Sequence, residues 1–517
     1  MKIKYLLSTL FALLFVISSC DRDFEKINTN PILATDLDPL YLFTEAQRVA
    51  DVSTYHYQGE IVQQIVTPYG GVLEGGNRNT VNDANSNAMF NTLYQSPVRN
   101  LVDALRKLEG NPARTNLYNM CRIWKAYCFQ LLVDTYGDVP YTEAGLGFIN
   151  ANFLPKYDDQ KAIYEDILKE YEQATDALDP AKDVVKEMFF NGDIAKWKKL
   201  GNSLLLRAGM RYTKLNPDKA KQIVEKAVNP SRGGVMSSNA DNVYLQYNPT
   251  YSYGTGNMLN STERHNYYVG EPFVDYLKST NDPRARYILI KYEFPYNPLE
   301  TAGATNNNLE DQQGMPYGYD ENSISSAPGF PGKIGAAFAY SQYNRATVGK
   351  IDGRSWLVTY ALTELLLAEA CHRDFITTGT ALSHYEAGIR AAMEQNNNLF
   401  GPAYAITPDE INDYLAQTEI AFDPAKALKQ INEQYWVSSC MNWAENWANF
   451  RRSGYPQLSP INYRGEDPSV QTPSAGGFIH RLPYPLREKT VNTANVNAAA
   501  TNIGGDNLGT RVFWDVQ

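Results

Sequence analysis

Apolar residues recur every three to four positions in two long stretches of this 517-residue chain, and this periodicity restricts the fold to a mainly α class. In 115–136, for example, Leu117, Met120, Trp124 and Leu131 fall on one helical face. The first stretch predicts helices over 115–136, 158–178, 194–215 and 218–228, and the second predicts helices over 356–372, 382–394 and 424–450. Such successive helices favour antiparallel pairs that stack in a solenoid-like way.

The periodicity fades between about 233 and 354, where Gly, Asn, Ser, Pro and Tyr crowd together around a short predicted helix over 272–277. A loop region of that length inside a compact protein is usually functional. We therefore predict a single helical domain over 41–517 that carries a loop-rich insertion at about 233–354.

The N-terminus has the layout of a bacterial lipoprotein export signal. Lys2 and Lys4 precede an apolar stretch from Leu6 to Ile17, and Ser18 and Ser19 lead to Cys20. The apolar stretch is too short to span a bilayer, so 1–19 are predicted to be cleaved and Cys20 to carry lipid. The alternative is an ordinary secretory signal with an incidental cysteine. The polar segment 20–40 is predicted to be a tether and arm.

The charge balance excludes some partners. Without Lys2 and Lys4 the chain has 45 basic and 57 acidic residues, a net charge of −12. This surface repels phosphate backbones and anionic headgroups, which argues against nucleic acid and leaves the lipid as the only predicted membrane anchor. The five histidines are scattered and show no metal-ligand spacing, so no metal or cofactor is predicted.

Four further cysteines sit among apolar residues: Cys121, Cys128, Cys371 and Cys440. An exported chain permits disulfides. Cys121 and Cys128, however, lie two turns apart on one predicted helix, too far to pair with each other. Buried free thiols are the favoured interpretation.

Several motifs, in order, resemble the SusD/RagB family of Bacteroidetes outer-membrane lipoproteins, in particular its SusD-like branch. They begin at Cys20 and cover almost the whole mature chain. The matching segments are Cys20-Asp-Arg-Asp-Phe-Glu-Lys-Ile-Asn-Thr-Asn-Pro31, Trp124 through Ala144 with Tyr136-Gly-Asp-Val-Pro-Tyr141, Tyr157-Asp-Asp-Gln160, Leu365-Leu-Leu-Ala-Glu-Ala370, Tyr385-Glu-Ala-Gly388, Asn446-Trp447, Arg451-Arg-Ser-Gly-Tyr-Pro456 and Arg481-Leu-Pro-Tyr-Pro485.

The resemblance implies tetratricopeptide-like helix pairs with long loops that form the ligand face. It also implies a surface-exposed outer-membrane lipoprotein that covers a SusC-like TonB-dependent transporter and captures glycans or, in some members, peptides. Asp21, Asp23 and Glu25 are consistent with an acidic surface-export tag, although Arg22 interrupts it.

Tyrosine is abundant, with 36 residues, and several tyrosines cluster in the insertion. A flat ring with a hydroxyl suits stacking on a sugar. The predicted ligand-binding residues are Arg78, Tyr247, Tyr251, Tyr253, Tyr267, Tyr268 and Tyr317. The alternative for each tyrosine is that it packs beneath the loops.

Nucleotide-binding loops, serine-hydrolase elbows and metalloprotease motifs are absent from the sequence, so no catalytic residue is predicted. The favoured function is capture of oligosaccharide or polysaccharide nutrient. A peptide-binding importer of the same architecture and a surface glycan hydrolase are the alternatives.

Overall fold

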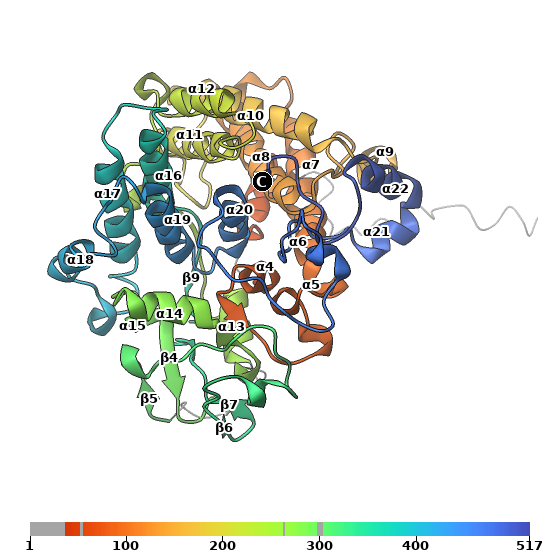
Figure 1. Cartoon of the computed structure of the whole chain (residues 1–517). Helices are drawn as coiled ribbons and strands as arrows, with labels where there is room; N and C mark the ends of the chain where they lie inside the picture. Colours follow the sequence, from red (N-terminus) through yellow and green to blue (C-terminus); the bar gives the residue numbers. More distant parts are fainter. Residues whose placement is uncertain (1–36, 52–54, 262–263, 297–302) are drawn as a thin grey trace, which may run out of the picture.

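The computed structural model describes residues 37–51, 55–261, 264–296 and 303–517, so the predicted signal, Cys20 and the acidic tag lie outside the described residues. Helices surround most of the body and short strands gather at one end (Figure 1). The helices before the insertion are α3 (Pro39–Arg48), α4 (His56–Ile61), α5 (Asp83–Ser86), α6 (Ala88–Leu93), α7 (Arg99–Leu108), α8 (Thr115–Tyr136), α9 (Gly147–Asn150), α10 (Gln160–Ala177), α11 (Ile194–Met210) and α12 (Pro217–Ala227). Those after it are α16 (Tyr360–His372), α17 (Ala381–Glu394), α18 (Pro408–Leu415), α19 (Ala427–Ser438), α20 (Trp443–Ser453), α21 (Leu486–Val491) and α22 (Thr493–Asn502).

Neighbouring helices pack in consecutive pairs, which confirms the mainly α class with tetratricopeptide-like helix pairs. Helix α10 packs on α8 and α11, α11 packs on α12, and α16 packs on α17 and α19. Small residues permit the close approaches. A Cβ atom at Gly201 of α11 would lie 1.9 Å from the Thr175 hydroxyl of α10, and one at Gly388 of α17 would lie 2.8 Å from Leu365 of α16.

The insertion contains more regular structure than the sequence predicts. Its helices are α13 (Gly254–Asn260), α14 (Glu271–Ser279) and α15 (Ala285–Ile288), and its strands are β2 (Val243–Gln246), β3 (Tyr268–Val269), β4 (Leu289–Tyr292), β5 (Thr305–Asn306), β6 (Lys333–Ile334), β7 (Ala337–Phe338) and β8 (Gln342–Tyr343). Strand β1 (Ile65–Val66) comes from the first helical block, and β9 (Arg354–Val358) lies at the end of the insertion. Antiparallel pairing joins β1 to β3, β2 to β9, β6 to β7, and β4 to both β5 and β8. A small separate core of Tyr268, Met315, Phe338 and Tyr340 supports this end.

Three predicted helix bounds differ from the structure. The helix predicted over 194–215 ends at Met210, as α11, and 211–215 form turns. The helix predicted over 356–372 begins only at Tyr360, because 354–358 alternate between buried and partly exposed side chains as strand β9. The helix predicted over 424–450 is two helices, α19 and α20, separated by a turn in which Met441 takes a left-handed φ of 70°.

The two helical blocks meet at buried polar groups. The Asp134 carboxylate of α8 accepts hydrogen bonds from Tyr164 of α10 at 2.8 Å and from the indole of Trp514 near the C-terminus at 2.8 Å. Arg211 bridges this carboxylate (3.3 Å) to Glu445 of α20 (2.7 Å). These buried hydrogen bonds and ion pairs join residues that are far apart in the chain, so the two helical blocks form one body.

All four described cysteines are free thiols, Cys121 and Cys128 buried and the other two half-buried. Among the described residues, no helix combines the length and apolarity needed to cross a bilayer.

Candidate functional site

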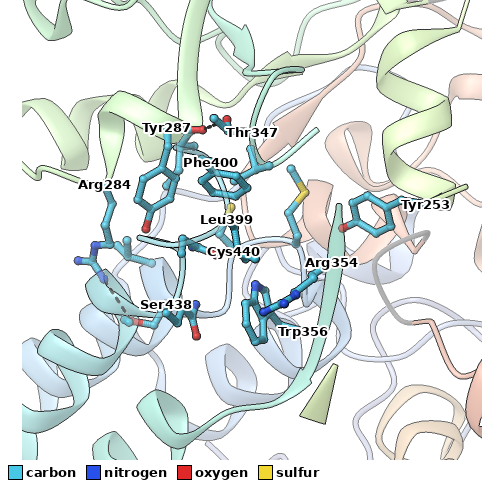
Figure 2. Close-up of a pocket in the computed structure, with 17 residues that line it drawn as sticks. Tyr253, Arg284, Tyr287, Thr347, Arg354, Trp356, Leu399, Phe400, Ser438 and Cys440 are labelled. Carbon is cyan, nitrogen blue, oxygen red and sulfur yellow. Dashed lines mark hydrogen bonds between the residues drawn. The ribbon is translucent and has the colours of Figure 1, made fainter. Parts of the chain in front are cut away.

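A pocket lies where the insertion meets the second helical block (Figure 2). Four parts of the chain contribute its walls: Tyr253 and 347–356 of the insertion, α15, the segment after α17, and the turn after α19. Its free volume is about 50 Å³, which is space for a few water molecules. A sugar ring is larger, so a ligand here would lie across the mouth and insert only one substituent.

Strand alternation places the aromatic and basic side chains of the mouth. In β9, Ser355 and Leu357 face the core, whereas Arg354 and Trp356 are half-exposed on the opposite face. On the paired strand β2, Tyr244 lies opposite Trp356, and their ring centroids are 5.2 Å apart. The Arg354 guanidinium lies 4.1 Å from the centre of the Tyr244 ring and donates from Nε to Gln246 at 2.7 Å.

A second aromatic pair lines the opposite wall. Tyr287 of α15 and Phe400 have ring centroids 5.6 Å apart, and Figure 2 shows both rings across the pocket from Trp356. Leu399 and Ala392 add apolar surface. The interior of the pocket is therefore largely apolar on this side.

Two hydrogen-bond acceptors that line the pocket have no partner among the described residues. The side-chain amide oxygens of Gln395 and Asn396 are buried and accept no hydrogen bond from any described residue. Arg284 is occupied, because it pairs with Asp282 at 2.6 Å and donates to Ser438 at 3.2 Å. Buried acceptors without a donor cost free energy, so a ligand N–H or O–H, or water, would be stabilised here.

The pocket offers little for acid–base or nucleophilic catalysis. Its lining residues include no carboxylate and no imidazole. Burial raises the pKa of its one thiol, Cys440, to about 12, so this group stays protonated and unreactive at neutral pH. The described residues also contain no group of three or more His, Cys, Asp or Glu side chains arranged to hold a metal ion.

The sequence matches a family model named SusD-like and described as "starch-binding associating with outer membrane" over residues 31–485. The chain belongs to the SusD-like family. Its members share the large helical fold described above. No protein among the curated sequences matches this chain.

Solved SusD-like structures resemble the chain over nearly its full length. A chitin-binding protein is 27% identical, with 93% of this chain and 100% of that chain covered and a TM-score of 0.75. A Bacteroidetes SusD-like protein is 24% identical, with coverage of 93% and 100% and a TM-score of 0.78. A chitin-binding SusD homolog from Flavobacterium johnsoniae is 22% identical, with coverage of 92% and 97% and a TM-score of 0.73. The last two establish the common fold.

Three of the predicted ligand residues of this SusD-like chain lie close together near the pocket. Tyr253 forms part of its wall and packs on Tyr247, with ring centroids 5.4 Å apart. Tyr247 donates its hydroxyl to Asp51 at 2.9 Å, and Tyr251 is 63% exposed on the adjoining turn. Of these three, only Tyr251 presents a largely free ring.

The other four predicted residues lie elsewhere and make structural contacts. Arg78 is buried and donates to the carbonyls of Pro68 and Tyr69 at 2.5 and 2.7 Å. Tyr317 donates to the Ile65 carbonyl at 2.7 Å. Tyr268 is fully buried in β3 and accepts from the Phe338 N–H at 2.9 Å, whereas Tyr267 is 7% exposed. These four residues do not line the pocket, and ligand contact by each of the seven predicted residues stays a prediction.

Sequence reasoning missed the main pocket residues. Trp356 was assigned to the start of a helix, although Arg354-Ser-Trp-Leu-Val358 after Gly353 alternates as a strand does. Gln395, Asn396 and Phe400 follow a helix end, and nothing local in their sequence indicates that they face Trp356.

Proposed function

We propose that this chain is a surface-exposed outer-membrane lipoprotein that binds oligosaccharide or polysaccharide nutrient and delivers it to a partner SusC-like TonB-dependent transporter. Family membership supports nutrient binding at the outer membrane. The lipobox ending at Cys20 supports anchoring through lipid. Capture without turnover is consistent with a pocket whose lining has no acid–base pair.

The observation that carries the glycan proposal is the pairing of a half-exposed Trp356 with buried amide acceptors in the same pocket. An aromatic face provides a platform for the apolar face of a sugar ring. The oxygens of Gln395 and Asn396 would accept hydrogen bonds from the substituent that enters the pocket.

An N-acetylated glycan fits this combination best. Its acetamido N–H is a donor for the amide oxygens, and its methyl group suits the small apolar wall of Leu399 and Phe400. The related structure at 27% identity is named a chitin-binding protein, which supports the same class of ligand. A maltose-type glycan has hydroxyl donors but no methyl group to bury in the pocket.

Titration calorimetry with chitin oligomers, maltose oligomers and mixed peptides tests the proposal. We expect chitin oligomers to bind most tightly and Trp356→Ala to weaken that binding about tenfold, in line with the loss of roughly 1–2 kcal/mol of ring contact. Gln395→Leu should weaken chitin binding more than maltose binding. Phe294→Ala, at an exposed aromatic outside the pocket, is the matched control.

Binding of peptides without binding of any glycan would overturn the glycan assignment in favour of the peptide importer. If the parent chain and Trp356→Ala bind chitin oligomers with equal affinity, the pocket is not the glycan-binding site. Tyr251→Ala tests the exposed ring on the neighbouring turn and shows whether the ligand extends beyond the pocket.

A further inference from the structure

Large apolar side chains are exposed together on one side of the molecule, away from the pocket. Phe148 is 85% exposed, Phe153 is 68% exposed and Leu154 is 51% exposed, all within or just after α9. Ile149 and Val491 of α21 are 38% and 60% exposed. These five residues are called the apolar ridge below. Contiguous exposed apolar side chains of this size mark an interaction surface.

Hydrogen bonds hold the ridge in place. Asn495 of α22 donates to the Leu154 carbonyl at 3.1 Å, and Asn492 donates to the Pro155 carbonyl at 2.7 Å. Glu143, which precedes α9, accepts from the N–H of Lys156, which follows it, at 2.9 Å, and this hydrogen bond closes the loop. Figure 1 shows α9, α21 and α22 gathered at one edge of the molecule. The ridge is therefore built on a braced loop.

A basic groove borders the ridge. Arg99, Arg106 and Lys107 of α7 line it together with Phe148 and Ile149, and its free volume is about 650 Å³. Asp103 is the one carboxylate in that lining, and it lies 2.9 Å from Arg106 and 3.9 Å from Lys107. The groove thus has an excess of positive charge, although the whole chain has a net charge of −10.

The chain enters the folded body at this groove. Lys107 donates to the carbonyl of Leu37, the first described residue. Leu37 lies seventeen positions after Cys20, which is a reach of at most about 60 Å. A lipid attached to Cys20 would therefore hold Leu37 and the groove beside it within about 60 Å of the membrane surface.

We propose that this face lies against the outer membrane, with the apolar ridge in the interfacial region of the lipids and Arg99, Arg106 and Lys107 paired with headgroup phosphates. The proposal rests on the lipid anchoring included in the proposed function. One acyl chain gives only marginal attachment, and stable binding takes a second contact such as apolar insertion or a basic patch. The ridge and the groove supply both, and they would fix the orientation of the pocket relative to the bilayer.

Vesicle co-sedimentation of the mature chain from residue 20, carrying Cys20→Ser so that no lipid is attached, tests this face directly. We expect binding to vesicles that contain phosphatidylglycerol and weaker binding to vesicles of phosphatidylcholine alone. Phe148→Ser with Phe153→Ser should weaken binding to both at least tenfold. Arg99→Glu with Arg106→Glu should weaken only the binding to phosphatidylglycerol vesicles. Leu382→Ser, at an exposed apolar residue of α17, should leave both unchanged.

Absence of binding to either vesicle, or equal binding by the parent and the Phe148/Phe153 variant, would overturn the proposal. So would a variant that binds vesicles normally but no longer co-purifies with the transporter, because the ridge would then be a protein interface. Thermal unfolding of each variant checks its fold. Since no lipid is attached, the result is independent of whether Cys20 is acylated in cells, which cell fractionation tests separately.

Discussion

At the scale of the residue, burial decides what a side chain does more than its chemical type. Tyr268 and Tyr251 lie in the same tyrosine-rich segment, but one is fully buried and the other is 63% exposed. Sequence composition identified the segment and had no means of separating the two roles. Trp356 shows a related limit, since most of the residues that line the pocket with it come from segments far away in the chain.

Glu60 gives a residue-scale prediction. Burial raises the pKa of Glu60 to about 8, against hydrogen bonds from the Asn77 and Gly76 backbone that lower it. Between about pH 4.5 and 8 the folded chain keeps a proton that the unfolded chain releases, so this group makes stability fall as the pH rises. We expect Glu60→Gln to remove that decline, which is worth a few kcal/mol at about 1.4 kcal/mol per pKa unit.

Urea unfolding at pH 5 and pH 8.5 measures this effect. The free energy of unfolding of the parent should fall more between the two values than that of Glu60→Gln. Glu310→Gln, at an exposed glutamate, should behave as the parent does. Parallel curves for the parent and Glu60→Gln would show that Glu60 does not titrate in this window.

At the scale of the element, periodicity predicted the helices well where each helix has one core-facing stripe. Helix α12, which buries only Ala220, Val224 and Ala227, spans 217–227 against the predicted 218–228. Asp159 and Asp193 cap α10 and α11 as polar residues before an apolar run should. The errors at 356–372 and 424–450 arose where buried residues surround the chain on all sides. Helix α16, for example, is buried along nearly its whole length, so its apolar residues are not confined to one face.

The ion pair between α16 and α20 gives an element-scale prediction. Arg452 donates to both oxygens of Glu369 at 2.7 Å, and both side chains are 1% exposed. Although burial alone would raise the pKa of Glu369, Arg452 and Arg373 hold it below its usual range. Arg452→Met removes one partner and leaves a buried carboxylate underpaired, so we expect a loss of about 3 kcal/mol in unfolding free energy.

Chemical unfolding of Arg452→Met, Glu369→Gln and the double variant separates two contributions to the loss of stability, the unpaired charge and the altered packing. The double variant contains neither buried charge of this pair, and Arg373, the other partner of Glu369, is 24% exposed and can be hydrated, so the double variant should recover part of the loss. If the single and double variants are equally destabilised, the loss comes from packing around Arg452 and not from the carboxylate.

At the scale of the whole molecule, the ordered set of motifs predicted the family and the mainly α architecture, and the motif that begins at Arg451 sits at a structural junction. Arg451 donates to the carbonyls of His480 and Asp134 and so connects three distant segments. The small sheets of the insertion escaped prediction, since most of their strands have only two residues and the longest that lie wholly within it, β2 and β4, have four, too few to show a clear alternation.

Lipid anchoring gives a whole-molecule prediction. The parent chain should fractionate with the outer membrane, and Cys20→Ser should move most of it to the soluble fraction, because the acyl chains supply the main attachment. Cys371→Ser, at a half-buried thiol of the body, is the control and should stay with the membrane. Membrane retention of Cys20→Ser at the parent level would contradict lipidation at this cysteine.

The hydrogen bond between Asp134 and Trp514 also has a consequence for biogenesis. The two residues are 380 positions apart, and Trp514 is 1% exposed in the centre of the molecule. A ribosome that has finished α8 must therefore make most of the protein before the acceptor at Asp134 receives this donor. Until then the first helical block lacks this hydrogen bond, which suits the export proposed above, in which the chain would cross a membrane before it folds.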